Sequence, residues 1–570
     1  MAYSNHMLNS LFNTVVRLSP KVLITILILP VFAGLLGVLL PAFGWLPALG
    51  KTQLGLQGFS QLLQTPGLKQ MVALSFSTSL LSGLLAFIFT LLLLATFFDS
   101  PWLIRIRRIL SPILVIPHAA AAIAIAFLIT PSGMISRLFS PWLTQWHIAP
   151  DWLLPHDPYG ISIIIGLTLK ELPFLMLMTL NAMAQPALNN KIQAQYRVAL
   201  SLGYYPITAF FKVVLPTIYP LMRLPLLAIL AYASASVEMP LILGPNTPPT
   251  LAVAIMNWFH DVDLSMRIQA SAGALLQLLV TVLVLTTWWL LERAMKKVSY
   301  VSLSNGKRNY GDIILAKAVA LLTVLLILVI ALSLAGLVIW SFAGYWHFPA
   351  LLPEQWLLIH WQSALLQLQI PLMNTVLVGL LSTFIAVVLT LLTLEFEQQN
   401  RVKLTKFHSL LIYLPLLIPS IAFLFGLVWL QEALHSDSTF VNVVFAHLLF
   451  VLPYVFLSLA NSYRRLDPRY AQLAASLGAT PVKVFFKVTL PQLFAAILVA
   501  SALGLAISFS QYLPTQLASG GRMLTLTTET VTLANGASRR VSSVYALMQM
   551  ILPAMAFLMV WLILKFKRKW

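Results

Sequence analysis

The chain has 570 residues, of which 59% are hydrophobic and only 9% are charged. Soluble globular proteins carry roughly 25% charged residues, so this composition cannot cover a water-exposed surface and indicates an integral membrane protein. Lys and Arg number 35 against 16 Asp and Glu, a formal charge of +19. Cysteine is absent, which excludes disulfides and thiolate chemistry.

Twelve apolar stretches of the sequence are long enough to cross a bilayer as helices, which takes about 20 residues each. We therefore expect an all-α integral membrane protein. The predicted spans lie near residues 22–43, 72–98, 110–130, 159–184, 222–243, 269–291, 313–340, 372–394, 408–430, 441–463, 492–513 and 543–564.

The basic residues fall into two sets along this topology. With the N-terminus inside, 26 of the 35 lie in cytoplasmic segments and 7 in outer loops, as the positive-inside rule requires. We therefore expect both termini in the cytoplasm. The charge of +19 is then explained by topology, and no nucleic-acid partner is implied.

Two predicted cytoplasmic segments repeat one another. Residues 199–216 (ALSLGYYPITAFFKVVLP) and 474–491 (AASLGATPVKVFFKVTLP) are identical at 11 of 18 positions, with a constant offset of 275. We interpret the chain as two six-span repeats of parallel orientation, residues 1–292 and 313–570. A polar cytoplasmic linker over residues 293–312 joins them.

Shorter similarities surround the repeated segment. They pair Ile116-Pro117 with Ile418-Pro419, Ser77-Thr78 with Asn374-Thr375, Leu172-Pro173 with Leu452-Pro453, and Thr250-Leu251 with Thr525-Leu526.

The repeated segment predicts two short helices joined by a sharp turn. Gly203 and Gly478 permit the turn because they lack a Cβ atom, and a proline three residues later suits the start of a helix. The Phe-Phe pairs that follow (210–211 and 485–486) place large apolar groups on a segment expected to be polar. They either anchor the segment in lipid headgroups or form a docking knob for a cytoplasmic partner.

This spacing of Gly, nine residues, Val, one residue and Leu-Pro resembles the signature of binding-protein-dependent ABC importer permeases, the MetI-like family. The family pattern begins Glu-Ala-Ala, whereas this sequence has Arg197 and Gln472 in place of the Glu. The resemblance implies that the two segments dock ATPase subunits. The residues it assigns to docking are Ala199, Ser201, Leu202, Gly203, Phe210, Phe211, Leu215 and Pro216, and Ala474, Ser476, Leu477, Gly478, Phe485, Phe486, Leu490 and Pro491.

The resemblance extends over nearly the whole chain and is similar to the fused permeases of thiamine and iron(III) importers. It implies two copies of a cytoplasmic ABC ATPase, a periplasmic solute-binding protein and a bacterial inner-membrane location. The solute stays open among a thiamine-like cation, iron(III), a polyamine and an anion.

The sequence contains no phosphate-binding loop of the form Gly, four residues, Gly-Lys-Ser/Thr. We therefore expect a transport subunit, with no ATPase site and no cofactor of its own, whose partners hydrolyse ATP. The alternative is a twelve-span secondary transporter driven by an ion gradient.

Ionisable residues within spans are candidates for the translocation path. Lys170 and Glu171 fall in the fourth span, and Glu238 near the fifth has Gln511 as its approximate counterpart. A structural alternative pairs Lys170 with a carboxylate such as that of Glu238. His118 is expected to be a hydrogen-bonded core residue.

The predicted outer loops hold a group of histidines and carboxylates. Their spacing does not enforce a metal site, so we expect solvated loops and no metal. The group consists of His147, Asp151, His156, Asp157, His260, Asp261 and Asp263.

Overall fold

The computed structural model describes residues 2–400, 406–435, 438–536 and 538–567. These residues form helices and no β-strand, with isolated bridges only at Leu46–Lys51 and Ala343–Trp356. Eleven of the described helices are long and apolar enough to cross a membrane, or twelve if one bent pair counts as a single span. The chain is therefore an all-helical, multi-pass membrane protein, as its composition predicts.

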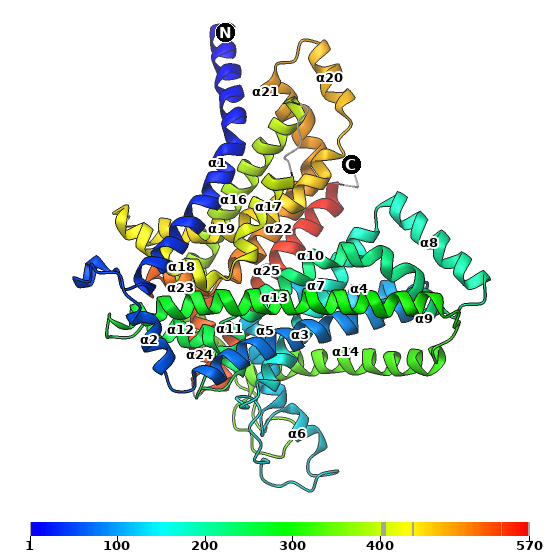
Figure 1. Cartoon of the computed structure of the whole chain (residues 1–570), viewed down its shortest axis with the longest axis vertical. Helices are drawn as coiled ribbons and strands as arrows, with labels where there is room; N and C mark the ends of the chain where they lie inside the picture. Colours follow the sequence, from blue (N-terminus) through cyan, green and yellow to red (C-terminus); the bar gives the residue numbers. More distant parts are fainter. Residues whose placement is uncertain (1, 401–405, 436–437, 537, 568–570) are drawn as a thin grey trace. The chain divides into compact units, whose positions relative to one another are not determined.

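The helices belong to two compact units (Figure 1). The 39–364 unit comprises Leu39–Ala364 and Thr530–Leu547, and the 365–529 unit comprises Met1–Val38, Leu365–Glu529 and Met548–Trp570. The first helix, α1 (Ala2–Ala42), lies mostly in the 365–529 unit, whereas α14 (Asp312–Phe342) lies in the 39–364 unit. The first helix of each predicted repeat thus packs with the later helices of the other repeat.

The remaining elements of the 39–364 unit are η1 (Pro47–Leu49), α2 (Gln57–Gln64), α3 (Leu68–Phe97), α4 (Pro101–Val115), α5 (His118–Ile129), α6 (Met134–Phe139), α7 (Ile161–Met183), α8 (Pro186–Ser201), α9 (Pro206–Ala209), the π-helical turn η2 (Phe210–Val214), α10 (Leu215–Ser234), α11 (Glu238–Leu243), α12 (Leu251–Phe259) and α13 (Met266–Ser304). Those of the 365–529 unit are α16 (Gln369–Asn400), α17 (Lys406–Leu417), α18 (Ser420–Ala433), α19 (Thr439–Arg464), α20 (Pro468–Ser476), α21 (Pro481–Val484), the π-helical turn η3 (Phe485–Thr489), α22 (Leu490–Phe509) and α23 (Leu513–Ser519). The helices α15 (Ile359–Gln367), α24 (Leu526–Ala534) and α25 (Arg539–Lys567) run across unit boundaries.

Two predicted spans are broken at an Ile-Pro pair. The span predicted over 110–130 consists of α4 and α5, separated by Ile116 and Pro117 in extended conformation. The span predicted over 408–430 consists of α17 and α18, which meet at 107° around Pro419. Proline lacks an N–H and disfavours helical conformation in the residue before it. The Ile-Pro similarity therefore marks a helix break in both units.

The fifth predicted span is also placed differently. The membrane-length helix runs over Pro206–Ser234, and the end of the predicted stretch forms the separate short helix α11. Residues 235–237 interrupt the helix between them.

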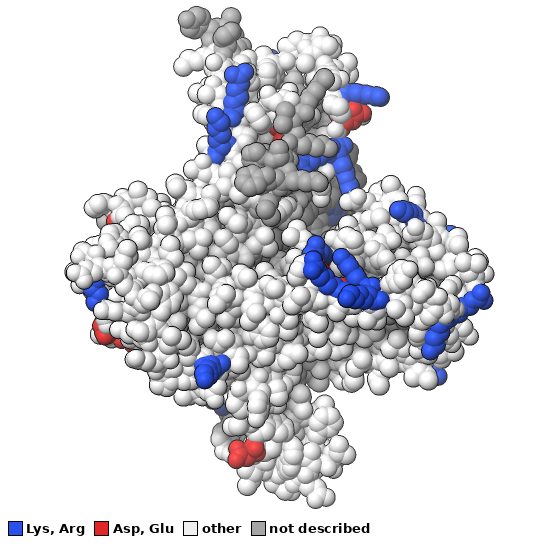
Figure 2. Space-filling view, viewed as in Figure 1, with Lys and Arg blue, Asp and Glu red and all other residues white. Residues whose placement is uncertain are grey.

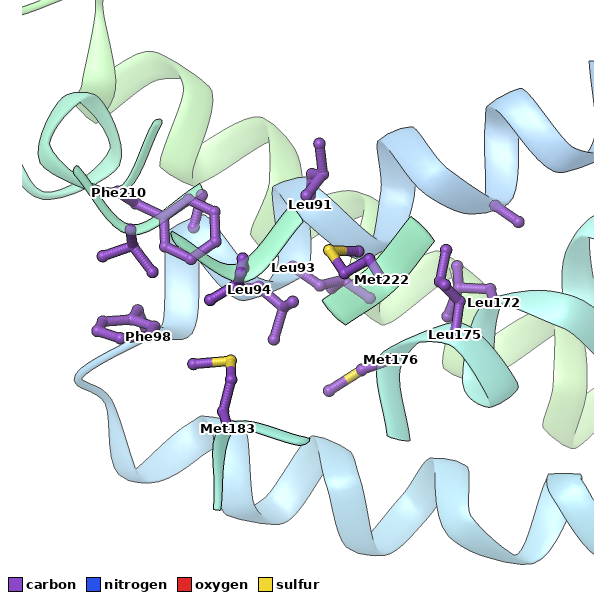
Figure 3. Packing of buried hydrophobic residues seen from close by; sticks show 14 of the residues in the cluster. Leu91, Leu93, Leu94, Phe98, Leu172, Leu175, Met176, Met183, Phe210 and Met222 are labelled. Carbon is purple, nitrogen blue, oxygen red and sulfur yellow. The ribbon is translucent and has the colours of Figure 1, made fainter. Parts of the chain in front are cut away.

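The core of the 39–364 unit gathers side chains from α3, α7, the end of α8 and η2. Figure 3 shows Phe210 of η2 pointing toward Leu94 and Phe98, with Met183 nearby. The loop that contains η2 is thus anchored in the same apolar core as the membrane helices.

In the 365–529 unit, α1 crosses α18 at a pair of glycines. A Cβ atom on Gly426 would lie 1.9 Å from the carbonyl oxygen of Gly34, and one on Gly37 would lie 2.7 Å from the Cα of Gly426. Small residues allow membrane helices to approach this closely. The crossing therefore depends on the missing side chains.

We expect Gly426→Ala to lower the stability of the folded protein by about 1–3 kcal/mol, as overpacking does. Alanine is a better helix former than glycine, so a loss of stability would come from the steric clash and not from helix propensity. The matched control is Gly55→Ala, where a Cβ meets nothing within 4 Å. Thermal unfolding in detergent, followed by tryptophan fluorescence, measures both; equal stability of Gly426→Ala and the unmodified protein would contradict the crossing.

Candidate functional site

The two repeated segments adopt the same local fold in their separate units. We call residues 186–216 the first loop segment and residues 468–491 the second. Gly203 and Gly478 turn the chain with φ of +82° and +83°, in the left-handed region that favours glycine. Pro206 and Pro481 each begin the next helix. The predicted helix and turn are confirmed at both copies. The second helix is not short, however, because it continues through Leu-Pro into the membrane-length helices Pro206–Ser234 and Pro481–Phe509.

Each segment then passes through a π-helical turn before the following membrane helix. The Leu215 N–H donates to the carbonyl of Phe210, and the Leu490 N–H donates to that of Phe485, five residues back in both cases. The residue after each leucine is a proline, which lacks an N–H and so cannot continue the regular α-helical ladder. Such π turns are often found at functional sites.

One ring of each phenylalanine pair is buried in the core and so cannot contact a cytoplasmic partner. Phe210 is fully buried and Phe485 is 4% exposed, and Phe210 contacts Phe98 with ring centroids 5.5 Å apart. Consecutive residues on a helix point about 100° apart, so one ring of each pair enters the core. Only Phe486 of the second pair is largely exposed, at 57%.

Further exposed apolar side chains lie at the turn that precedes each phenylalanine pair. Val198 and Leu202 are 59% and 57% exposed, and Leu473 and Leu477 are 61% and 80% exposed. Residues four apart share one helix face. The two pairs occupy equivalent positions at the offset of 275. Leu202 and Leu477 were predicted from the sequence, whereas Val198 and Leu473 were not, although their agreement within a polar helix could have identified them.

The base of the first loop segment is buried. The Tyr196 ring lies 4.9 Å from that of Phe98, and Tyr196 is 2% exposed. Burial, together with the carboxylates of Asp99 and Asp312, raises the pKa of Tyr196 to about 12. The phenol therefore stays neutral, and α8 is held by an apolar contact at its inner face.

Lys170 caps the broken end of α4. Its ammonium group donates to the carbonyls of Ile113 and Leu114 at 3.0 and 3.1 Å, and to that of Ile116. A small cavity beside it is lined mainly by aliphatic side chains of α4, α5, α7 and α14. The predicted pairing of Lys170 with Glu238 is wrong, because the carbonyls left free by the Ile-Pro break take the ammonium group.

Glu171 and Glu238 lie around two aromatic rings. The Glu171 carboxylate is 3.4 Å from Nε2 of His118, and the Tyr232 hydroxyl donates to Glu238 at 3.1 Å. The rings of His118 and Tyr232 are 4.8 Å apart. His118, Tyr232 and Glu238 are half-buried, so the structure joins both glutamates in one partly open polar cluster.

Gln511 lies in the 365–529 unit, in the turn between α22 and α23. His447, which sequence reasoning missed, holds both sides of this turn. Its Nδ1 is 2.7 Å from the Ser508 hydroxyl and its Nε2 is 2.8 Å from the Thr515 hydroxyl. The ring is buried, so it positions the turn that presents Gln511.

The Thr-Leu motifs begin α12 and α24 in the same way. The Leu251 N–H donates to the Ser75 hydroxyl at 2.9 Å, and the Leu526 N–H donates to the Thr375 hydroxyl at 2.8 Å. The equivalent of Thr375 is therefore Ser75, in place of the Ser77-Thr78 pair that the sequence suggested.

Five of the seven histidines and carboxylates of the predicted outer loops have hydrogen-bond partners, namely His156, Asp157, His260, Asp261 and Asp263. Asp157 accepts hydrogen bonds from the first amides of α7, at 2.7 Å from Ile161 and 2.9 Å from Ser162. His156 contacts the Gly244 carbonyl at 2.7 Å. Within the described part of the chain, no three His, Asp or Glu side chains are grouped to hold a metal ion.

The sequence of this chain is similar to sequences of known proteins. Residues 396–564 match the family model described as binding-protein-dependent transport system inner membrane component. The inner membrane ABC transporter permease protein YnjC of Escherichia coli is 29% identical over 513 residues, which cover 90% of this chain and 91% of that protein. The chain is similar to ABC transporter permeases.

Shorter matches involve two polyamine permeases. The putrescine transport system permease protein PotI of Escherichia coli is 28% identical over 25% of this chain and 54% of its own length. A homologue of the spermidine/putrescine permease protein PotC from Mycoplasma pneumoniae is 27% identical over 26% of this chain and 54% of its own length. These comparisons support an ABC transporter permease.

Replacing Lys170 by methionine should destabilise the protein by about 1–3 kcal/mol, because carbonyls at the end of α4 lose their donor. The matched control is Lys317→Met on the exposed surface of α14, which should not lower stability. Thermal unfolding of both variants in the same detergent tests the cap. A Lys170→Met protein as stable as Lys317→Met would contradict it.

Proposed function

We propose that the chain is the membrane-spanning subunit of an ATP-driven importer, with both predicted repeats fused in one polypeptide. The observation that carries this proposal is the loop segment that occurs twice with one geometry. Each copy has a left-handed glycine, a helix-starting proline, a π-helical turn and an exposed apolar pair. One ATPase subunit docks under each segment, and the match to permeases of this kind supports the assignment.

The proposed topology places both loop segments and both termini in the cytoplasm. Its support is the charge distribution, since most basic residues fall in the segments assigned to the inside. The solute is delivered by an extracytoplasmic binding protein, and the location is a bacterial inner membrane. Polyamines are named for relatives that match about a quarter of this chain, whereas the relative that matches most of it names no solute.

The proposal predicts that Leu202→Asp combined with Leu477→Asp abolishes co-purification of a co-expressed ABC ATPase subunit. Both side chains are exposed, so the substitutions remove docking contacts without opening the core. Leu54→Asp is the control, because Leu54 is 71% exposed and lies outside both segments.

Two results would contradict the importer assignment. One is full ATPase recovery with the double variant. The other is solute uptake by liposomes that contain the chain alone, driven by an ion gradient without ATP, which is the behaviour of a secondary transporter.

We further propose that the translocation path passes Glu171 and Glu238 in one unit and Gln511 in the other. The support is the partly open cluster around His118 and Tyr232, and the cost of placing polar groups within spans without a function. Lys170 is assigned to the helix cap instead.

Because the chain lacks cysteine, single cysteines test this path directly. Glu238→Cys and Gln511→Cys should react with a charged, membrane-impermeant thiosulfonate in proteoliposomes, at rates that change when the ATPase binds nucleotide. Leu325→Cys, on the exposed surface of the membrane-length helix α14, should stay unreactive. Absence of labelling at both path positions in every nucleotide state would exclude them from the path.

A further inference from the structure

The two loop segments have nearly the same sequence but different surroundings. In the 39–364 unit, the chain that follows α13 returns across the first loop segment before it enters α14. We call residues 305–312 of this return the linker strap. Its Asp312 carboxylate accepts hydrogen bonds from the Thr208 amide at 2.8 Å and from the Thr208 hydroxyl at 2.6 Å. All four of these oxygen and nitrogen atoms belong to buried residues.

The strap also binds the lysine of the repeated motif. Lys212 donates to Oδ1 of Asn305 at 2.9 Å, and its ammonium group lies 5.3 Å from the Tyr204 ring and 5.6 Å from the Tyr310 ring. Such positions over aromatic rings are favourable for cations. Lys212 is consequently only 8% exposed.

At the turn itself, the strap lies over the glycine. The Tyr205 amide donates to the Arg308 carbonyl at 3.0 Å. A Cβ atom on Gly203 would meet the Arg308 guanidinium at 3.2 Å. The strap therefore holds the backbone of the first loop segment at the turn and just after it.

The second loop segment has no such cover among the described residues. A Cβ on Gly478 would meet nothing within 4 Å. Lys487, the equivalent of Lys212, is exposed, as is Lys483 at the position of Thr208. The difference follows from chain connectivity, because the sequence places one linker after the first copy of the motif.

We propose that the linker strap is part of the first docking surface, so that the ATPase meets two chemically different surfaces on one permease. The first is ordered in advance and adds the exposed cations Lys307 and Arg308, which fit an acidic patch on the ATPase. The second lacks the strap and exposes Leu473, Leu477 and Phe486 together with Lys483 and Lys487. The docking role of the strap rests on the proposed importer function, which supplies the ATPase partner. The ordering of the first loop segment by the strap does not depend on that function.

Exposed basic side chains are visible over the α8 and α9 end of the 39–364 unit (Figure 2). Other groups of basic side chains are visible elsewhere on this face. Those beside the first loop segment can complement an acidic patch on a partner.

Hydrogen exchange of the full chain in lipid nanodiscs, without ATPase, tests the ordering. Amides of residues 203–211 should exchange about tenfold to a hundredfold more slowly than those of 478–486, the range expected for hydrogen bonds to a charged group. Asp312→Asn and Thr208→Val should each reduce the difference in exchange rate between the two segments. Asp467→Asn, which changes a helix cap of the second segment, should leave the first segment unchanged. Equal exchange of the two segments in the unmodified protein would overturn the inference.

Charge reversal tests the docking surface. In a Leu477→Asp background, where only the first surface can dock, Lys307→Glu with Arg308→Glu should weaken binding of the purified ATPase at least about tenfold. In a Leu202→Asp background, where only the second surface can dock, the same reversal should have no effect. Equal effects in the two backgrounds would overturn the composite surface and leave the importer function standing.

The two proposals fail separately. If the unmodified chain does not bind the ATPase, the proposed function and the docking role of the strap are both wrong. The exchange experiment needs no partner, and it still decides whether the strap orders the first loop segment.

Discussion

The architecture of this membrane protein depends on satisfying backbone groups where its apolar helices are broken. Within a bilayer no water is available to pair a free N–H or C=O, so each break needs a partner from the protein. At the end of α4 that partner is Lys170, which takes three carbonyls. At the starts of α12 and α24 it is a hydroxyl from α3 or α16, which accepts from a leucine amide. Lys170, Ser75 and Thr375 are thus helix caps.

The need to pair backbone groups distinguishes charged side chains that cap helices from those that we propose line the translocation path. A lysine that donates all three of its protons to carbonyls has little capacity left for a solute. The glutamates around His118 and Tyr232 are different, because their cluster is partly open and its contacts are to ionisable or hydroxyl groups. Two adjacent residues of one helix, Lys170 and Glu171, therefore have unrelated roles, which follows from their pointing about 100° apart.

Hydropathy was sufficient to predict the helical class and most spans, since a run of about 20 apolar residues has few alternatives. It could not show that two of these runs bend at Ile-Pro, because a proline within an apolar run is compatible with a kinked or a broken helix. The repeat predicted the two loop segments, and glycine and proline fixed their turns. Which phenylalanine of each pair is buried depends on the rotation of the helix against α3 and its neighbours, information that lies far away in the sequence.

The partner of Lys170 shows the same limit. Sequence reasoning pairs charges with charges, whereas the acceptors here are backbone carbonyls more than 50 residues away, created by a break that hydropathy does not reveal. His447 is similar, because its hydroxyl partners Ser508 and Thr515 lie on two other elements. Such contacts become visible only when the packing of helices is known.

In the proposed arrangement of two similar repeats in one chain, the two loop segments have different surroundings. One copy of the motif is followed by a linker that leads into the next predicted repeat, and the other copy is not. The linker binds the first loop segment through Asp312 and Asn305. The strap thereby replaces contacts that two separate subunits would have to make with a partner or with water. A near-identical pair of sequences thus acquires two different environments, and an ATPase pair that docks beneath them would sense the difference.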